Sequence, residues 1–207
     1  GSDTLTMVTT DSGNTGSGGA LTDTDTIAIT VTPVNDAPAG TDATITLDED
    51  GSRTLTAADF GFEDPIDGAS AAGADALAAV RISSLPAAGE LRYAGTAITQ
   101  AQVDGGYEVS AADIASGLLV FAPAADANGT GYASFTFQVR DDGGIANGGV
   151  DLDPGANAIT FNVTAVNDAP TADAISDTRT EDDSSYTLDL LTDANAADVD
   201  TGDTLSV

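Results

Sequence analysis

Residues 159–170, with the sequence ITFNVTAVNDAP, decide the fold class of this chain. The first half of the stretch alternates the apolar side chains of Ile159, Phe161 and Val163 with polar ones. Alternation with a period of two predicts a β-strand with one buried face and one exposed face. The second half contains Asn, Asp and Pro, which predict a turn and a rigid connection after the strand.

The same motif occurs earlier in the chain and defines an internal repeat. The sequence VNDAP at residues 34–38 returns at residues 166–170, a displacement of 132 residues (168 − 36 for the shared Asp). The acidic pair at residues 49–50 returns at residues 181–182 with the same displacement (181 − 49). Self-similarity at a fixed period indicates tandem structural units. We therefore expect the end of one unit at residues 1–35, a complete unit at residues 36–168 and the start of a third at residues 169–207.

Short segments of strand-forming composition fill the complete unit, separated by Gly, Pro, Asn and Asp. About seven such strands per unit predict an all-β fold in which two sheets pack as a β-sandwich. Ser110 is the expected N-cap of a single helical turn at residues 111–115. The expected strands cover residues 44–47, 77–83, 90–93, 107–109, 118–121, 133–140 and 159–164.

The chain carries a large negative charge. Of its 207 residues, 34 are Asp or Glu and five are basic, which gives a formal net charge of −29. Such a charge argues against binding to nucleic acid or to an anionic membrane surface, since both depend on neutralising phosphates. The absence of His and Cys excludes Ser-His-Asp and Cys-His catalysis, the usual zinc sites and disulfides. A hydrophobic content of 41% is too high for a wholly disordered acidic chain.

The sequence contains neither a long apolar run nor a signal peptide at its start. We therefore expect no membrane insertion, and we expect the chain to be an interior piece of a longer protein.

Many of the acidic residues gather at the expected turns between strands. They lie at residues 48–50, 63–67, 141–142, 151–153 and 198–203. Turns at one end of a sandwich converge in space, so their carboxylates repel one another unless a cation lies between them. Calcium takes six to eight oxygen ligands and needs neither nitrogen nor sulfur donors, so Ca²⁺ is the expected metal.

Residues 159–170, the acidic pair at 181–182 and the stretch DVDTGDTL at 198–205 resemble the cadherin-like tandem repeat of large bacterial surface adhesins of the RTX and biofilm types. The resemblance implies a Greek-key β-sandwich of cadherin or immunoglobulin type. It implies an extracellular calcium-binding spacer or stalk on a bacterial cell surface, made rigid by Ca²⁺ at the junctions between repeats. The implied partners are neighbouring repeats, polysaccharide or a cell surface. Separately, the unpaired edge strands of the partial end units predict head-to-tail contacts with other copies.

The resemblance also implies a set of metal ligands. At the junction after the complete unit they are Glu49, Asp126, Asn167, Asp168, Asp198 and Asp200. At the junction before it they are Asn35, Asp36, Asp64, Asp67 and either Asp141 or Asp142. The segment from Asp64 to Asp67 is longer than the Asp-x-Asp pattern of the family, so we expect fewer ions per junction than the family holds.

Two other functions stay open on the sequence alone. Some cadherin-like bacterial domains resemble carbohydrate-binding modules, and a sugar ring could stack on Tyr93, Tyr107 or Tyr132. Packing against the core is the alternative use of these rings. A hydrolase would need two of the carboxylates to act as a catalytic pair. No pocket signal marks such a pair, so we expect the protein not to be an enzyme.

Overall fold

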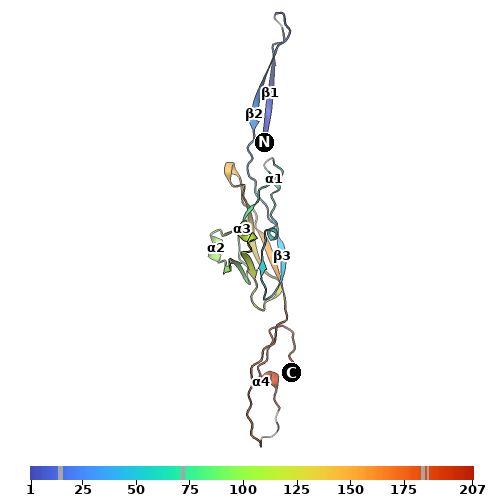
Figure 1. Ribbon diagram of the computed structural model, residues 1–207, viewed down its shortest axis with the longest axis vertical. Helices are drawn as coiled ribbons and strands as arrows, with labels where there is room; N and C mark the ends of the chain where they lie inside the picture. The colour runs from blue at the N-terminus through green and yellow to red at the C-terminus, as the bar shows by residue number, and fades with distance from the viewer. Residues whose placement is uncertain (14–15, 71–72, 183–184, 186) are drawn as a thin grey trace.

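The computed structural model of the chain describes residues 1–13, 16–70, 73–182, 185 and 187–207. Figure 1 shows an elongated molecule with a hairpin at one end, a β-rich body in the middle and a mostly irregular segment at the other end. Strands predominate over helices in the described part, where no helix exceeds five residues. None of these helices is long and apolar enough to cross a membrane.

The larger sheet of the body has five strands in the order β3-β11-β10-β5-β8. β3 runs parallel to β11, and the other neighbours are antiparallel. The alternation in the sequence is reflected in burial, since Phe135 and Phe137 of β10 and Phe161 of β11 are fully buried. The strands are β3 (Ala43–Asp48), β5 (Leu77–Ile82), β8 (Glu108–Ser110), β10 (Gly129–Asp141) and β11 (Asn157–Thr164).

The smaller sheet has four strands in the order β4-β9-β6-β7. They are β4 (Arg53–Thr54), β6 (Glu90–Tyr93), β7 (Thr96–Ala97) and β9 (Leu119–Ala122). The described helices are η1 (Ala57–Phe60), α1 (Pro65–Gly68), α2 (Gln100–Asp104), α3 (Ala111–Ala115), η2 (Ala146–Gly148) and α4 (Leu190–Asp193).

The two sheets share one hydrophobic core. The rings of Phe121 in β9 and Phe161 in β11 stack with their centroids 3.8 Å apart and their planes 4° from parallel. Phe60 of η1 meets Phe137 of β10 edge to face at 4.9 Å. Buried side chains of both sheets therefore form a single cluster, to which α3 contributes Ile114.

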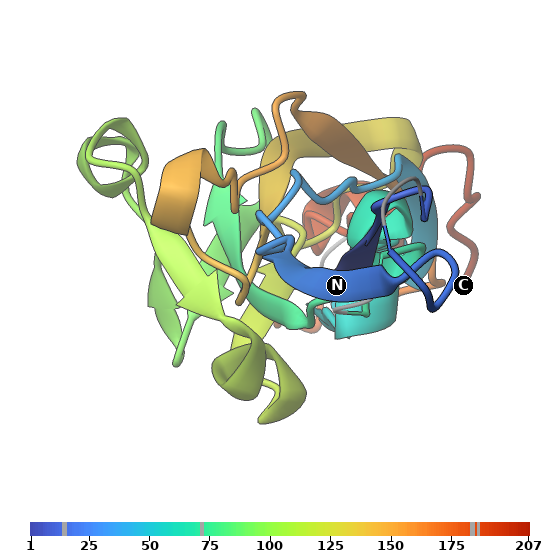
Figure 2. The same ribbon diagram turned by 90° about the horizontal axis from the view of Figure 1, so that it is seen from above.

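The N-terminal hairpin is a separate two-stranded sheet of β1 (Ser2–Thr10) and β2 (Thr22–Thr30). Figure 2 views the molecule along its long axis, with this hairpin in front of the body. Every residue of both strands is exposed, including the apolar residues Leu5, Ile27 and Ile29. In the described ranges neither strand pairs with the body, so the apolar face of the hairpin is uncovered.

The sequence pattern located the main strands of the body correctly. Each expected strand overlaps one in the structure, and β6 has the expected bounds. The expected helical turn is α3, which Ser110 caps by accepting a hydrogen bond from the N–H of Asp113 at 3.1 Å. The pattern does not predict β4 and β7, because each has two residues and two residues show no alternation.

Candidate metal centres

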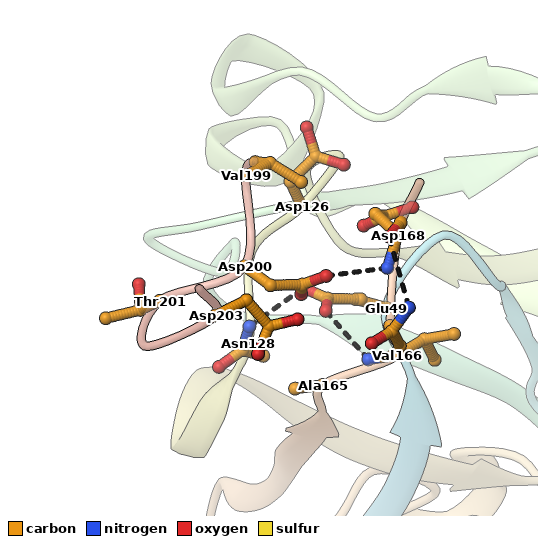
Figure 3. Close-up of a pocket in the computed structure, with 11 residues that line it drawn as sticks. Glu49, Asp126, Asn128, Ala165, Val166, Asp168, Val199, Asp200, Thr201 and Asp203 are labelled. Carbon is orange, nitrogen blue, oxygen red and sulfur yellow. Dashed lines mark hydrogen bonds between the residues drawn. The ribbon is translucent and has the colours of Figure 1, made fainter. Parts of the chain in front are cut away.

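Acidic side chains gather at both ends of the body, each time beside a VNDAP linker. The C-terminal cluster, most of which is drawn in Figure 3, consists of Glu49, Asp50, Asp126, Asp168, Asp198, Asp200 and Asp203. The N-terminal cluster consists of Asp64, Asp67, Asp75 and Asp141 together with Asn35 of the first linker. Both clusters combine residues that are far apart in the sequence, so the fold brings them together.

The parallel pairing of β3 with β11 places Glu49 beside the linker that follows β11. The Glu49 N–H donates to the carbonyl of Thr164 at 2.9 Å. The residue is 3% exposed, and its carboxylate accepts hydrogen bonds from the Val166 N–H and from Asn128 Nδ2, both at 2.9 Å. Glu49 is thus held in one orientation at the wall of a cavity of about 300 Å³.

Asp168 of the linker and Asp200 of the following segment line the same cavity (Figure 3). The Asp168 N–H donates to Asp200 Oδ2 at 2.6 Å, which ties the two segments together. Glu49, Asp168 and Asp200 each offer one carboxylate oxygen, and these three atoms lie within 4.8 Å of one another. Oxygens on opposite sides of a calcium ion are about 5 Å apart, because each lies about 2.3–2.6 Å from the metal. The spacing of the three carboxylates would therefore allow them to share a single metal ion.

Asp168 belongs to a second group of carboxylates as well. Together with Asp50 and Asp126 it offers three oxygens within 4.8 Å of one another, and Asp198, Asp200 and Asp203 form a further group of this kind. Asp168 Oδ2 is buried and has no hydrogen-bond partner. A buried oxygen without a donor is costly, so a cation would relieve Asp168 of an unfavourable state.

The surroundings of Asp168 raise the pKa of its carboxyl group. Loss of hydration raises the pKa of its carboxyl above the ordinary value of 3.8. The neighbouring charges raise this pKa further, and they belong to Asp50, Asp126, Asp200 and Glu49. The same surroundings that disfavour the ionised carboxylate favour a divalent cation, whose charge has the opposite sign.

The N-terminal cluster is organised by Asn35 of the first linker. Asn35 Nδ2 donates to Asp141 Oδ1 at 2.9 Å and to the carbonyls of Gly144 and Val150 at 3.1 and 2.9 Å. The Val150 N–H donates in return to the carbonyl of Asn35 at 3.0 Å. These bonds fix the linker to the loop that follows β10.

The two linkers share a hydrogen-bond pattern. The Asp36 N–H donates to Asp67 Oδ2 at 2.7 Å, just as the Asp168 N–H donates to Asp200 Oδ2 at 2.6 Å. The residue three positions after Asp36 forms an isolated antiparallel β-bridge, and so does the residue three positions after Asp168. The repeat seen in the sequence is therefore also a repeat of backbone geometry.

Most of the ligands implied by the resemblance lie in these clusters. The carboxylates of seven of them take part in groups of three: Glu49, Asp64, Asp67, Asp126, Asp168, Asp198 and Asp200. Asp141 joins the N-terminal cluster through its bond from Asn35.

Three further expected ligands make other contacts. Asp36 is exposed and contributes its N–H to the bond with Asp67. The Asp142 carboxylate accepts a hydrogen bond from the Ala76 N–H at 2.7 Å. Asn167 is exposed, and its Nδ2 donates to the carbonyl of Asp168 at 3.1 Å.

The sequence did not single out Asp50, Asp75, Asn128 or Asp203 as ligands, although all four lie in or beside the clusters. Asp50 directly follows Glu49, and Asp203 lies three residues after Asp200, both within acidic turns, so the turn pattern could have found them. Asp75 stands alone in a stretch of Ala and Gly, and Asn128 is held to Glu49 across the fold. No local pattern marks these last two.

The three tyrosines considered for sugar binding all make structural contacts. The rings of Tyr93 and Tyr107 meet edge to face at 6.2 Å, and the Tyr93 hydroxyl donates to Asp113 Oδ2 at 3.0 Å. The Tyr132 hydroxyl accepts a hydrogen bond from the Ala124 N–H at 3.1 Å. All three rings are partly buried and pack against the hydrophobic core.

Mild acid is expected to stabilise the metal-free protein through Asp141. Burial raises the pKa of Asp141 above 3.8, and the charges of Asp75 and Asp64 raise it further. Hydrogen bonds from Asn35 and Gly143 lower this pKa but do not outweigh burial. Because the pKa is higher in the folded state, the ionised carboxyl costs stability at neutral pH. This cost disappears as the pH falls below the pKa of the folded state towards the lower pKa of the unfolded state.

The measurement is the melting temperature in chelator between about pH 7 and about pH 4.5, the range above the ordinary Asp pKa. We expect the wild type to melt higher at the lower pH and Asp141→Asn to show a smaller rise. Equal rises in the two proteins would contradict a role for Asp141.

Comparisons with protein-family models, with curated proteins and with solved structures found no match for this chain.

Proposed function

We propose that this chain is a segment of tandem calcium-binding repeats that serves as an extracellular spacer or stalk in a bacterial surface adhesin. One observation carries the proposal: each VNDAP linker joins a cluster of carboxylates that contains a buried oxygen without a hydrogen-bond partner. Such an arrangement is unfavourable in the absence of a cation and favourable in its presence. Its occurrence at two equivalent linkers supports a role in joining repeats.

The proposal includes a cadherin-like or immunoglobulin-like Greek-key β-sandwich for the body. Two features support this finer description. The two sheets bury their apolar faces in a single core. The first strand of the body, β3, pairs with its last strand, β11, so the chain enters and leaves at neighbouring strands of one sheet.

The register of the N-terminal hairpin supports the tandem arrangement. Leu5 pairs with Ile27 in the hairpin, and Phe135 pairs with Ile159 in the body. These pairs are related by the sequence repeat, with displacements of 130 residues (135 − 5) and 132 residues (159 − 27). We therefore propose that β1 and β2 are the last two strands of a preceding unit. On this view their exposed apolar face is the one that the rest of that unit covers.

Calcium suits the clusters because the side-chain atoms that could coordinate a metal are carboxylate and amide oxygens. The chain has no His or Cys to favour a transition metal. A bound Ca²⁺ would supply the positive charge that the converging carboxylates lack. Extracellular calcium modules bind with dissociation constants of about 10⁻⁴–10⁻³ M, so millimolar calcium outside a cell would at least half-fill such sites.

The proposed role as a stiff spacer is supported by where the ligands of the C-terminal cluster come from in the chain. Glu49 follows β3 of the body, Asp168 lies in the linker and Asp200 lies in the next segment. Residues from three segments that share one cation cannot move independently. Cation binding would therefore restrict bending at the linker and turn a hinged chain into a stiff one.

A calcium titration of thermal unfolding tests the proposal. A cation that binds only the folded state stabilises it by RT ln(1 + [L]/Kd), which gives about 1–3 kcal/mol per site at about 10 mM calcium. We expect the melting temperature to rise by roughly 3–10 °C relative to chelator. Asp168→Asn should melt no lower than wild type in chelator, because it removes a repelling charge, but should gain clearly less from calcium.

The matched control is Asp104→Asn, which removes the charge of an exposed residue of α2 and should respond to calcium as the wild type does. Small-angle scattering of the wild type reports the stiffness separately, as a longer maximum dimension in calcium than in chelator. A melting temperature that calcium does not move, or an Asp168→Asn response equal to that of wild type, would rule out the junction site.

A further inference from the structure

The chain contains two Asn-Gly pairs, at residues 128–129 and 147–148, and they lie in different surroundings. Asparagine is among the heat-labile residues of proteins. When Gly follows it, no side chain obstructs the approach of the next main-chain nitrogen to the side-chain amide carbon. The reaction that follows replaces the amide by a carboxyl group and so creates a negative charge. Which of the two pairs can react therefore depends on how the fold holds each one.

The first pair is held on both sides, although Asn128 is exposed. Asn128 Nδ2 donates to Glu49 Oε2 at 2.9 Å, which is a hydrogen bond to a charged acceptor. Gly129 begins β10 and pairs with Val163 of β11. Attack by the Gly129 nitrogen would require the Asn128 side chain to leave Glu49 and the start of the strand to distort. Exposure alone therefore does not make this pair reactive.

The second pair has none of these restraints. Asn147 is exposed, and no hydrogen bond joins its side chain to any residue in the described part of the chain. Within η2 its backbone has φ 56° and ψ 22°, the left-handed region that residues other than Gly adopt at a cost. Gly148 is exposed too, and a Cβ placed on it would meet no atom within 4 Å. Neither burial nor a side-chain hydrogen bond therefore opposes a rotation that brings the Gly148 nitrogen to the Asn147 amide.

The loop that contains Asn147 is the one that holds the first linker. The carbonyls of Gly144 and Val150 accept hydrogen bonds from Asn35 Nδ2 at 3.1 and 2.9 Å. The Val150 N–H donates to the Asn35 carbonyl at 3.0 Å. Gly149 lies so close to the linker that a Cβ on it would be 3.1 Å from Asn35 Cβ. Asn147 therefore lies midway between the two points at which this loop is attached to the linker.

We propose that Asn147 is a site of spontaneous deamidation, which changes the loop that holds the first linker as the protein ages. The Gly148 nitrogen bonds to Asn147 Cγ and loses its proton, and the side-chain nitrogen leaves as ammonia. Water, the other reactant, then opens the resulting succinimide ring at either of its carbonyls and leaves aspartate or isoaspartate. Isoaspartate lengthens the main chain between Gly144 and Val150 by one carbon atom. The hydrogen bonds from Asn35 to both ends of the loop depend on that length.

Peptide mass spectrometry after incubation in warm, mildly alkaline buffer tests the inference. The buffer contains chelator, so that the outcome does not depend on the proposed calcium sites. Trypsin cleaves after Arg, which places Asn128 in the peptide 93–140 and Asn147 in the peptide 141–179. Fragment spectra then locate the change of mass at one residue. We expect Asn147 to convert at least about tenfold faster than Asn128, because Asn128 must first give up a hydrogen bond to a charged group.

The same chain in concentrated urea is the control for intrinsic reactivity. Residues 127–129 and 146–148 both have the sequence Ala-Asn-Gly, so unfolding should make the two rates similar. The folded protein is incubated until half of each pair has converted in urea, so that a lack of conversion is informative. If Asn147 converts no faster than Asn128 in the folded chain, the inference is wrong.

Asn147→Gly tests the effect on the linker. Glycine suits a positive φ and has no side-chain amide, so this variant should fold as the wild type does and should not react at this position. We expect the melting temperature of the wild type in chelator to fall by roughly 2–4 °C as Asn147 converts, and that of the incubated variant to stay unchanged. An equal fall in both proteins, or no fall in the wild type, would overturn the effect assigned to the loop.

Discussion

Replacement of Phe161 by Ala is expected to destabilise the body by about 3–5 kcal/mol. The Phe161 ring is fully buried in β11 and stacks on Phe121 of β9 at 3.8 Å, so it links the two sheets. Removal of the ring takes away a large apolar surface and leaves a cavity that rigid strands on both sides cannot close. Urea denaturation followed by circular dichroism measures the loss.

Ile29→Ala is the matched control for this variant, because Ile29 precedes Phe161 by the 132-residue repeat. Ile29 is 44% exposed on the uncovered hairpin, and it makes no part of the hydrophobic core. We expect its replacement to change the unfolding of the body by less than about 0.5 kcal/mol. Similar losses for Phe161→Ala and Ile29→Ala would contradict the packing described here.

Replacement of Asn35 by Ala is expected to cost about 2–4 kcal/mol, although Asn35 lies in a linker. Its Nδ2 donates to three acceptors, of which the Asp141 carboxylate is charged and buried. Hydrogen bonds to charged groups contribute about 1.5–3 kcal/mol. In the variant Asp141 Oδ1 would keep only the hydrogen bond from the Gly143 N–H at 3.0 Å. The variant should also free the linker from the loop that follows β10.

Asn167→Ala tests whether the loss of stability in Asn35→Ala comes from the contacts of Asn35 or from the removal of any linker asparagine. Asn167 is the repeat equivalent of Asn35 in the second VNDAP motif, yet it is exposed and its Nδ2 donates only to the adjacent carbonyl of Asp168 among the contacts described. We expect a loss below about 0.5 kcal/mol. Thermal unfolding of both variants in chelator separates the hydrogen bonds from any effect of calcium, and equal losses would show that Asn35 has no special structural role.

The strands of the body were predictable because their signal is local. Runs of strand-forming residues bounded by turn-forming residues, with clear alternation in the two longest strands, identify a strand without reference to the rest of the chain. The same local reasoning identified Ser110 as a cap, since capping involves a residue only three positions away. It could not identify β4 and β7, where two residues pair because longer strands lie beside them.

The candidate sites were only partly predictable. The family resemblance implied that Glu49, Asp168 and Asp200 share one junction, and the structure brings their carboxylates together. Their approach depends on the parallel pairing of β3 with β11, which no feature of the sequence specifies. Asn128 and Asp75 belong to the clusters through loops whose course is set by packing, so no local pattern distinguishes them from other polar residues.

The β-rich class, the 132-residue repeat and the placing of acids at turns could be predicted from the amino-acid sequence, because side-chain periodicity and turn chemistry depend on near neighbours. That Phe161 is buried while Ile29 is exposed, and that Asn35 makes several hydrogen bonds to the body while Asn167 does not, became evident only from the folded chain. The members of each pair have the same place in the repeat. Their difference arises because burial and convergence of charges depend on segments far away in the chain. For the same reason Asp75, one acid among 34, became a candidate ligand only when folding placed it beside Asp64 and Asp67.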